Sequence, residues 1–129
     1  MTCTSSIVRT LAAVAGLMLV AGCLEGGVDQ IRDPQKKAEY HCRYVLERAL
    51  ASSGELSPDG VLRERIAEFA NPRIQRNGDN VSFVWPAGAI SRIGAAGGHS
   101  GECVMDIGDG QRLVSAKLDD RPLHAGFRF

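Results

Sequence analysis

The chain has 129 residues with 15 basic and 15 acidic side chains, so its formal net charge is zero. This length suits one small domain. The balanced charge argues against a nucleic-acid-binding protein, because such proteins present a net basic field that displaces counterions from phosphates.

The first 22 residues have the pattern of a targeting segment. Arg9 is the only charged residue before an apolar stretch that runs from Leu11 to Ala21. Such a stretch matches the apolar region of a signal peptide, and it is too short to cross a hydrocarbon core about 30 Å thick. A cleaved signal peptide is therefore favoured over a transmembrane helix.

This stretch closes on Val20-Ala21-Gly22-Cys23, which resembles the lipobox of bacterial lipoproteins: an aliphatic residue, two small residues and a cysteine. The resemblance implies that Cys23 becomes the first mature residue and carries acyl chains. Two or more chains hold a protein stably on a membrane. Leu24 in place of Asp implies, by similarity to enterobacterial sorting, the outer membrane facing the periplasm. A generic secretory signal cleaved at Ala21-Gly22 stays open as the alternative.

We therefore expect a signal peptide over residues 1–22, a lipidated Cys23 with a flexible tether over 23–33, and a single small α+β domain over 34–129.

The first helix should begin at Asp33-Pro34, because Asp is a preferred N-cap and Pro suits the first helical position. Gly54 is placed to end it. Its apolar face comprises Ala38, Cys42, Val45, Leu46 and Ala49. Its opposite, solvated face is expected to carry Lys37, His41 and Arg48.

A second, shorter helix is predicted from Pro58 to Ala70. Leu62, Ile66 and Phe69 follow one another at helical spacing until Asn71-Pro72 stops the pattern. Gly60 counts against the first part of this helix, because glycine weakens a helix interior.

Beyond Pro72 the spacing changes to that of strands. Asn77-Gly78 separates 73–76 from 80–85 and predicts a hairpin. Ile74 should face the core together with Val81, Phe83 and Trp85, and Pro86 should end the strand. A mobile Gly-rich loop is expected over 86–101, because Gly-rich connections usually lie on the surface. Strands over 102–107 and 111–118 follow, and an edge or core-packing strand is expected over 123–129.

These elements predict an α+β fold, with one or two N-terminal helices packed on an antiparallel sheet of about four strands. Cys3 leaves with the signal peptide and Cys23 is taken by lipid, so Cys42 and Cys103 remain. In an oxidising compartment two thiols favour one disulfide, which would join the helix to the sheet. Two free buried thiols or a reactive nucleophile are the alternatives.

No motif for catalysis, cofactor binding or metal binding accompanies this fold. His41, His99 and His124 lack the spacing of metal ligands, and the aspartates 106, 109, 119 and 120 lack that of a calcium loop. His99-Ser100 has no nucleophile elbow beside it. We expect a non-catalytic envelope lipoprotein that binds a protein or cell-wall partner without a cofactor. A small periplasmic enzyme or an enzyme inhibitor is the second class.

Overall fold

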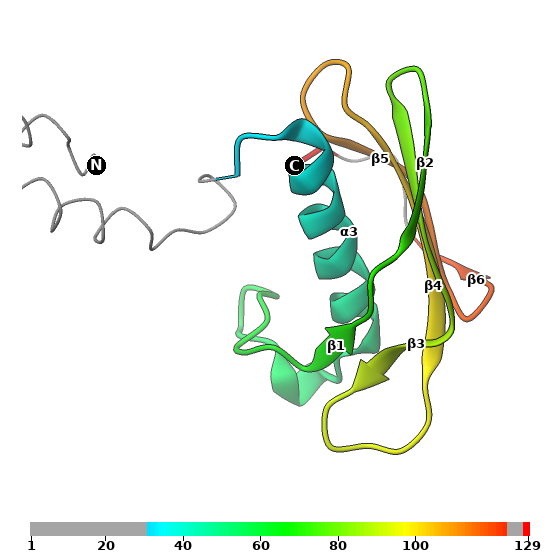
Figure 1. Cartoon of the computed structure of the whole chain (residues 1–129). Helices are drawn as coiled ribbons and strands as arrows, with labels where there is room; N and C mark the ends of the chain where they lie inside the picture. The colour runs from blue at the N-terminus through cyan, green and yellow to red at the C-terminus, as the bar shows by residue number, and fades with distance from the viewer. Residues whose placement is uncertain (1–30, 124–127) are drawn as a thin grey trace, which may run out of the picture. The chain divides into compact units, whose positions relative to one another are not determined.

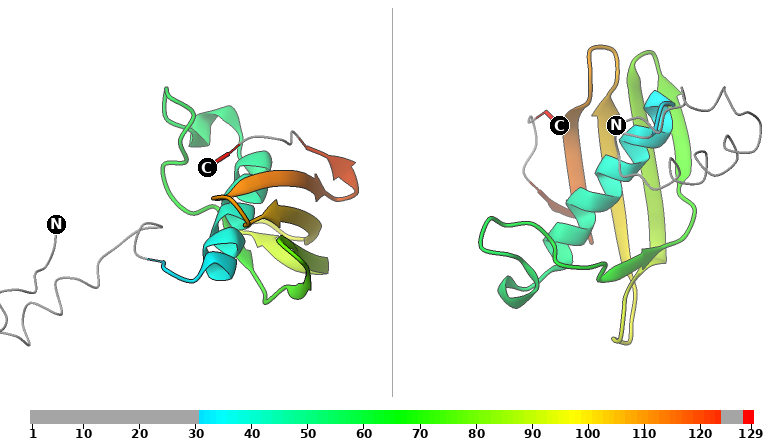
Figure 2. Two further views of the ribbon diagram at one scale, coloured as in Figure 1. Left: turned by 90° about the horizontal axis from the view of Figure 1, so that it is seen from above. Right: turned by 90° about the vertical axis from the view of Figure 1, so that its left-hand side faces the viewer.

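The computed structural model describes residues 31–123, 128 and 129, so the expected signal peptide, Cys23 and most of the tether lie outside the described residues. One helix packs on one face of a six-stranded antiparallel sheet (Figure 1; Figure 2). The α+β class is confirmed. The count of about four strands was too low, and the described residues contain one α-helix, within the one or two that were expected. No helix within them is long and apolar enough to cross a membrane.

Helix α3 spans Pro34–Leu50 and begins as predicted. The Asp33 side chain accepts a hydrogen bond of 3.2 Å from the Gln35 amide, which satisfies one of the free amides of the first turn. The helix packs on the sheet along one stripe of residues spaced by four positions. This fully buried stripe consists of Ala38, Cys42 and Leu46.

The helix ends earlier than Gly54, the predicted stop. Ala51 adopts an extended backbone and its amide bonds to the carbonyl of Arg48, and the short 3-10 helix η2 follows at Ser53–Glu55. The amide of Ser52 then donates to the Glu55 carboxylate at 2.7 Å. A polar local turn therefore terminates α3, without a glycine in the left-handed conformation.

The segment 58–70 is not a helix, contrary to the prediction. The Gly60 amide donates to the carbonyl of Ser57 at 2.8 Å, and Gly60 has a φ of +80°, so the chain turns where a helix would continue. A short strand, β1, follows at Ala67–Phe69. Ile66 is 7% exposed, so the apolar spacing reflected burial of an irregular segment rather than helical geometry.

Strands β2, Arg73–Asn77, and β3, Asn80–Arg92, form the predicted hairpin around Gly78. Strand β3 does not stop at Pro86 but continues through a register shift between Trp85 and Ile90. Such a shift tolerates proline, which has no amide to donate to the ladder.

The prediction of a single loop over 86–101 was therefore wrong. Its ends belong to β3 and to β4, His99–Asp106, which leaves only 93–98 as the connection. A Cβ on Gly98 would lie 2.7 Å from the Cα of Gly88, so the glycine allows the two backbones to approach.

Strands β5, Arg112–Leu118, and β6, Arg121–Pro122, complete the sheet, whose order is β1-β3-β4-β5-β6 with β2 also on β3. The core lies between α3 and this sheet, with Phe83 and Trp85 fully buried. Ile74 pairs with Phe83 and shares its face, yet it is 45% exposed. The prediction that it is a core residue was wrong, because α3 packs mainly over β3, β4 and β5.

Candidate functional site

Cys42 of α3 and Cys103 of β4 form a disulfide, with an S–S distance of 2.03 Å and a Cα–Cα distance of 5.9 Å. Both cysteines are fully buried. The predicted pairing between the helix and the sheet is confirmed, and neither cysteine is a free thiol or a nucleophile. Cys23, the predicted lipidation site, lies outside the described residues.

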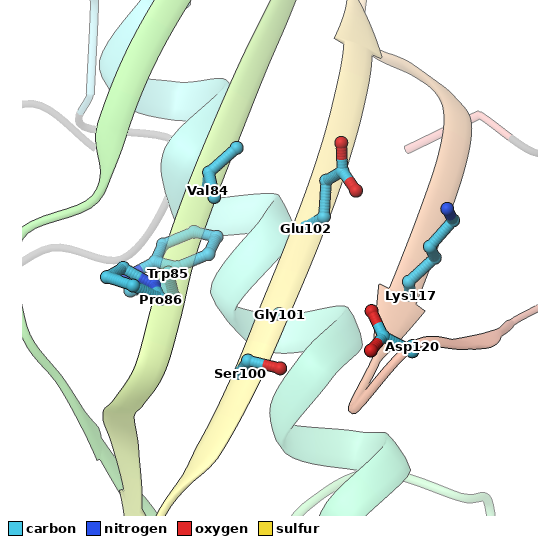
Figure 3. A pocket seen from close by; sticks show the side chains of 8 residues that line it. All are labelled: Val84, Trp85, Pro86, Ser100, Gly101, Glu102, Lys117 and Asp120. Carbon is cyan, nitrogen blue, oxygen red and sulfur yellow. The ribbon is translucent and has the colours of Figure 1, made fainter.

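The sheet face that turns away from α3 carries a hollow of about 140 Å³, which we call the open-face hollow (Figure 3). Val84 and Pro86 of β3 form its apolar side. Its polar side chains come from β4, from β5 and from the turn between β5 and β6. They are Ser100, Glu102, Lys117 and Asp120.

Strand register brings these polar groups together. Glu102 and Lys117 lie directly opposite each other in the pairing of β4 with β5, so their side chains leave the same face of the sheet. Figure 3 shows the charged ends of Glu102, Lys117 and Asp120 on the side away from α3. The hollow therefore offers both signs of charge beside an apolar surface.

The turn that carries Asp120 is strained and well fixed. Asp119 and Asp120 have φ values of 52° and 65°, the left-handed region that hairpin turns of two residues require. The two oxygens of Asp119 accept from His99 Nδ1 at 2.6 Å and from the amide of Ser100 at 3.0 Å. The hydrogen bond to His99 also lowers the pKa of the Asp119 carboxyl. These bonds tie the turn to the start of β4.

Most of the other sequence candidates have local roles. The described hydrogen bonds join His99 to Asp119 but not to Ser100, whose side chain leaves the opposite face of β4. Asp106 accepts from the Gly108 amide at 3.0 Å and pairs with Arg112. Over residues 31–123, 128 and 129, no group of three or more His, Cys, Asp or Glu side chains could hold a metal ion. His124 lies outside these ranges.

The prediction that His41 lies on a solvated face was wrong, because the residue is only 7% exposed. Its Nδ1 is hydrogen-bonded to Gln111 Oε1 at 2.9 Å, and its ring stacks on Phe129 with centroids 4.1 Å apart. Burial lowers the pKa of His41. The residues that cover it come from the other end of the chain, so helical spacing alone had no signal for this contact.

A second hollow, of about 200 Å³, lies along α3. We call it the tyrosine–arginine groove, and it is lined by Tyr40, Arg43, Tyr44, Glu47 and Arg65. Glu47 Oε2 accepts from the amides of Ile66 and Ala67 at 2.6 and 3.0 Å, which fixes the chain before β1 against the helix. The Arg43 guanidinium lies 5.7 Å from the ring centroid of Phe69.

No protein-family model, no curated protein and no solved structure matches this chain. The functional argument therefore rests on the residues and the geometry described above.

Proposed function

We propose that this protein is a lipid-anchored lipoprotein of the bacterial envelope whose domain, residues 34–129, acts by binding. The lipobox-like residues that end at Cys23 support the anchor, and Leu24 favours the outer membrane facing the periplasm. An acylated Cys23 would anchor the protein stably, because two or more acyl chains insert into the bilayer together. The bound partner is an envelope protein, and a cell-wall polymer is the alternative that the experiment distinguishes.

The open-face hollow is the observation that carries this proposal. Glu102, Asp120 and Lys117 offer both signs of charge beside the apolar Val84 and Pro86. Rigid strands hold most of these groups, so little side-chain and backbone freedom is lost when a partner docks. Opposite charges in fixed register also select a partner with the complementary pattern and exclude others. No cofactor is part of the proposal.

Capture from the native envelope by the acylated protein tests the proposal. Wild type and Arg76→Glu, a charge reversal at an exposed position of β2, should retain the same cross-linked partner. Lys117→Glu should lose it, because this reversal leaves the hollow with one sign of charge. Digestion of the cell wall before capture separates a wall polymer from a protein.

Two results would contradict the proposal. A partner retained equally by Lys117→Glu would exclude the open-face hollow as the binding surface. Mass spectrometry that finds an intact mature chain with another first residue and no lipid would exclude the anchor at Cys23.

A small enzyme is the second class, because the same hollow brings together a hydroxyl, an amine and two carboxylates. Turnover of an envelope substrate by the purified mature chain, lost in Glu102→Gln while the fold survives, would move the protein to that class. An enzyme inhibitor would appear in the capture experiment as a protein whose partner is an enzyme.

A further inference from the structure

The face of α3 that turns away from the sheet carries basic residues and two tyrosines. In the right-hand view of Figure 2, α3 lies in front of the sheet. A stripe of residues spaced by four positions runs along it and consists of Lys36, Tyr40, Tyr44 and Arg48. Residues at this spacing share one side of a helix. Lys36, Tyr40 and Arg48 are exposed, and Tyr40 is 45% accessible.

Basic groups outnumber acidic groups on and beside this stripe. The basic residues are Lys36, Lys37, Arg43 and Arg48 of α3, together with Arg65, which lines the tyrosine–arginine groove beside them. Of the nearby acids on α3, Glu39 pairs with Arg43, and Glu47 holds two backbone amides. The whole chain has a net charge of zero. The excess of positive charge is therefore a property of this side of the domain. We call these five residues and the two tyrosines the basic helix face.

The side chains of this face suit the headgroup region of a bilayer. Tyrosine has an apolar ring and a polar tip, and long basic side chains lay their stems on apolar surface while the charge stays in water. The Arg48 guanidinium already lies 5.7 Å from the ring centroid of Tyr44. Clusters of several basic residues are typical of surfaces that bind anionic lipid, and tyrosine is enriched at membrane–water interfaces.

We propose that the basic helix face rests on the phosphate headgroups of an anionic membrane surface, the one to which Cys23 fixes the chain. The inference uses the proposed anchor: residues 24–32 would span about 30 Å if extended, enough for α3 to reach the bilayer. A few basic residues attract such a surface weakly, and the anchor raises their local concentration. The open-face hollow lies on the sheet face that turns away from α3, so this contact turns it toward a partner.

The lysines provide the test, because Lys36, Lys37 and Lys117 are the only ones in the chain. The acylated protein is placed in vesicles of phosphatidylcholine, or of phosphatidylglycerol and phosphatidylcholine in equal amounts, and a membrane-impermeant reagent labels the amines. Labelling of Lys36 and Lys37 should fall several-fold on the anionic vesicles, while Lys117, on the open sheet face, stays the same. High salt should abolish the protection.

A matched pair of variants assigns the protection to charge. Arg48→Glu with Arg65→Glu should abolish the protection of Lys36 and Lys37. Arg73→Glu with Arg76→Glu makes the same charge change on β2 and should leave it intact. Equal labelling of the two α3 lysines in both kinds of vesicle would overturn the inference. Protection on phosphatidylcholine that appears only after envelope extract is added would also overturn it, in favour of a protein partner.

A second measurement separates this inference from the anchor. The described helices and strands lie within the compact unit 33–129. The chain 23–129 with Cys23→Ser carries no lipid and should still sediment weakly with the anionic vesicles. Each removed basic residue should lower its partition about fivefold. Binding by this chain, with no acyl group on the wild type, would overturn the anchor alone. No binding, with Cys23 acylated, would overturn the inference alone.

Discussion

Reduction of the Cys42–Cys103 bond is expected to lower the free energy of unfolding by about 4 kcal/mol. The two cysteines are separated by 61 positions. In the chain-entropy picture, a closed loop of this size removes about 14 cal/mol/K from the unfolded chain. Both sulfurs are buried in the core, and reduction removes no heavy atom from it, since it only adds one hydrogen to each sulfur. The effect therefore falls mainly on the unfolded chain, which gains freedom when the bond is cut.

Thermal unfolding of the oxidised and the chemically reduced protein measures this difference. In a domain of this size, 1 kcal/mol moves the Tm by about 4–8 °C, so reduction should lower the Tm by about 20 °C. The double variant Cys42→Ala with Cys103→Ala should melt lower still, because it also leaves a cavity. A reduced protein that melts within a few degrees of the oxidised one would refute the reasoning. Alkylation of both thiols in native, oxidised protein would refute the bond itself.

Three further predictions concern the contacts between α3 and the sheet. Glu47→Ala leaves two buried amides of residues 66–67 without a partner and should cost about 2–4 kcal/mol in urea unfolding; no change would exclude this role. Because burial lowers the pKa of His41 below 6.5, stability should be complete above pH 6.5 and fall as the pH drops. His41→Gln should make the free energy of unfolding less dependent on pH. If the pH dependence is unchanged in this variant, another group is responsible for it. A Cβ at Gly101 would lie 2.9 Å from a Leu46 methyl, so Gly101→Ala should destabilise by about 1–3 kcal/mol; a raised Tm would contradict this.

The correct sequence predictions concern elements with a strong local signal. Asp33-Pro34 begins α3, and Asn77-Gly78 lies at the hairpin between β2 and β3. A cap or a tight turn depends on two to four adjacent residues, so its chemistry is visible before the fold is known. The pairing of Cys42 with Cys103 followed from the number of cysteines left in the expected mature chain and from the faces on which helix and strand spacing placed them.

The incorrect predictions concern segments in which tertiary contacts outweighed local spacing. Residues 58–70 satisfied a helical pattern, yet the turn at Gly60 and the Glu47 carboxylate hold the chain in another conformation. The glycines of 86–101 suggested a loop, whereas they permit a register shift within β3 and a close approach of the connection 93–98 to β3. Spacing alone does not reveal which polar group will bond to a buried amide.

The open-face hollow had no sequence signal at all. Glu102, Lys117 and Asp120 belong to no motif, and strand register alone makes them neighbours. Composition and local chemistry were enough for the α+β class, the start of the helix, the hairpin and the disulfide, because each depends on short-range geometry or on a simple count. Tertiary structure alone decided which side chains converge on the open face, that His41 is buried, and that Ile74 is not. These outcomes depend on contacts between residues far apart in the chain.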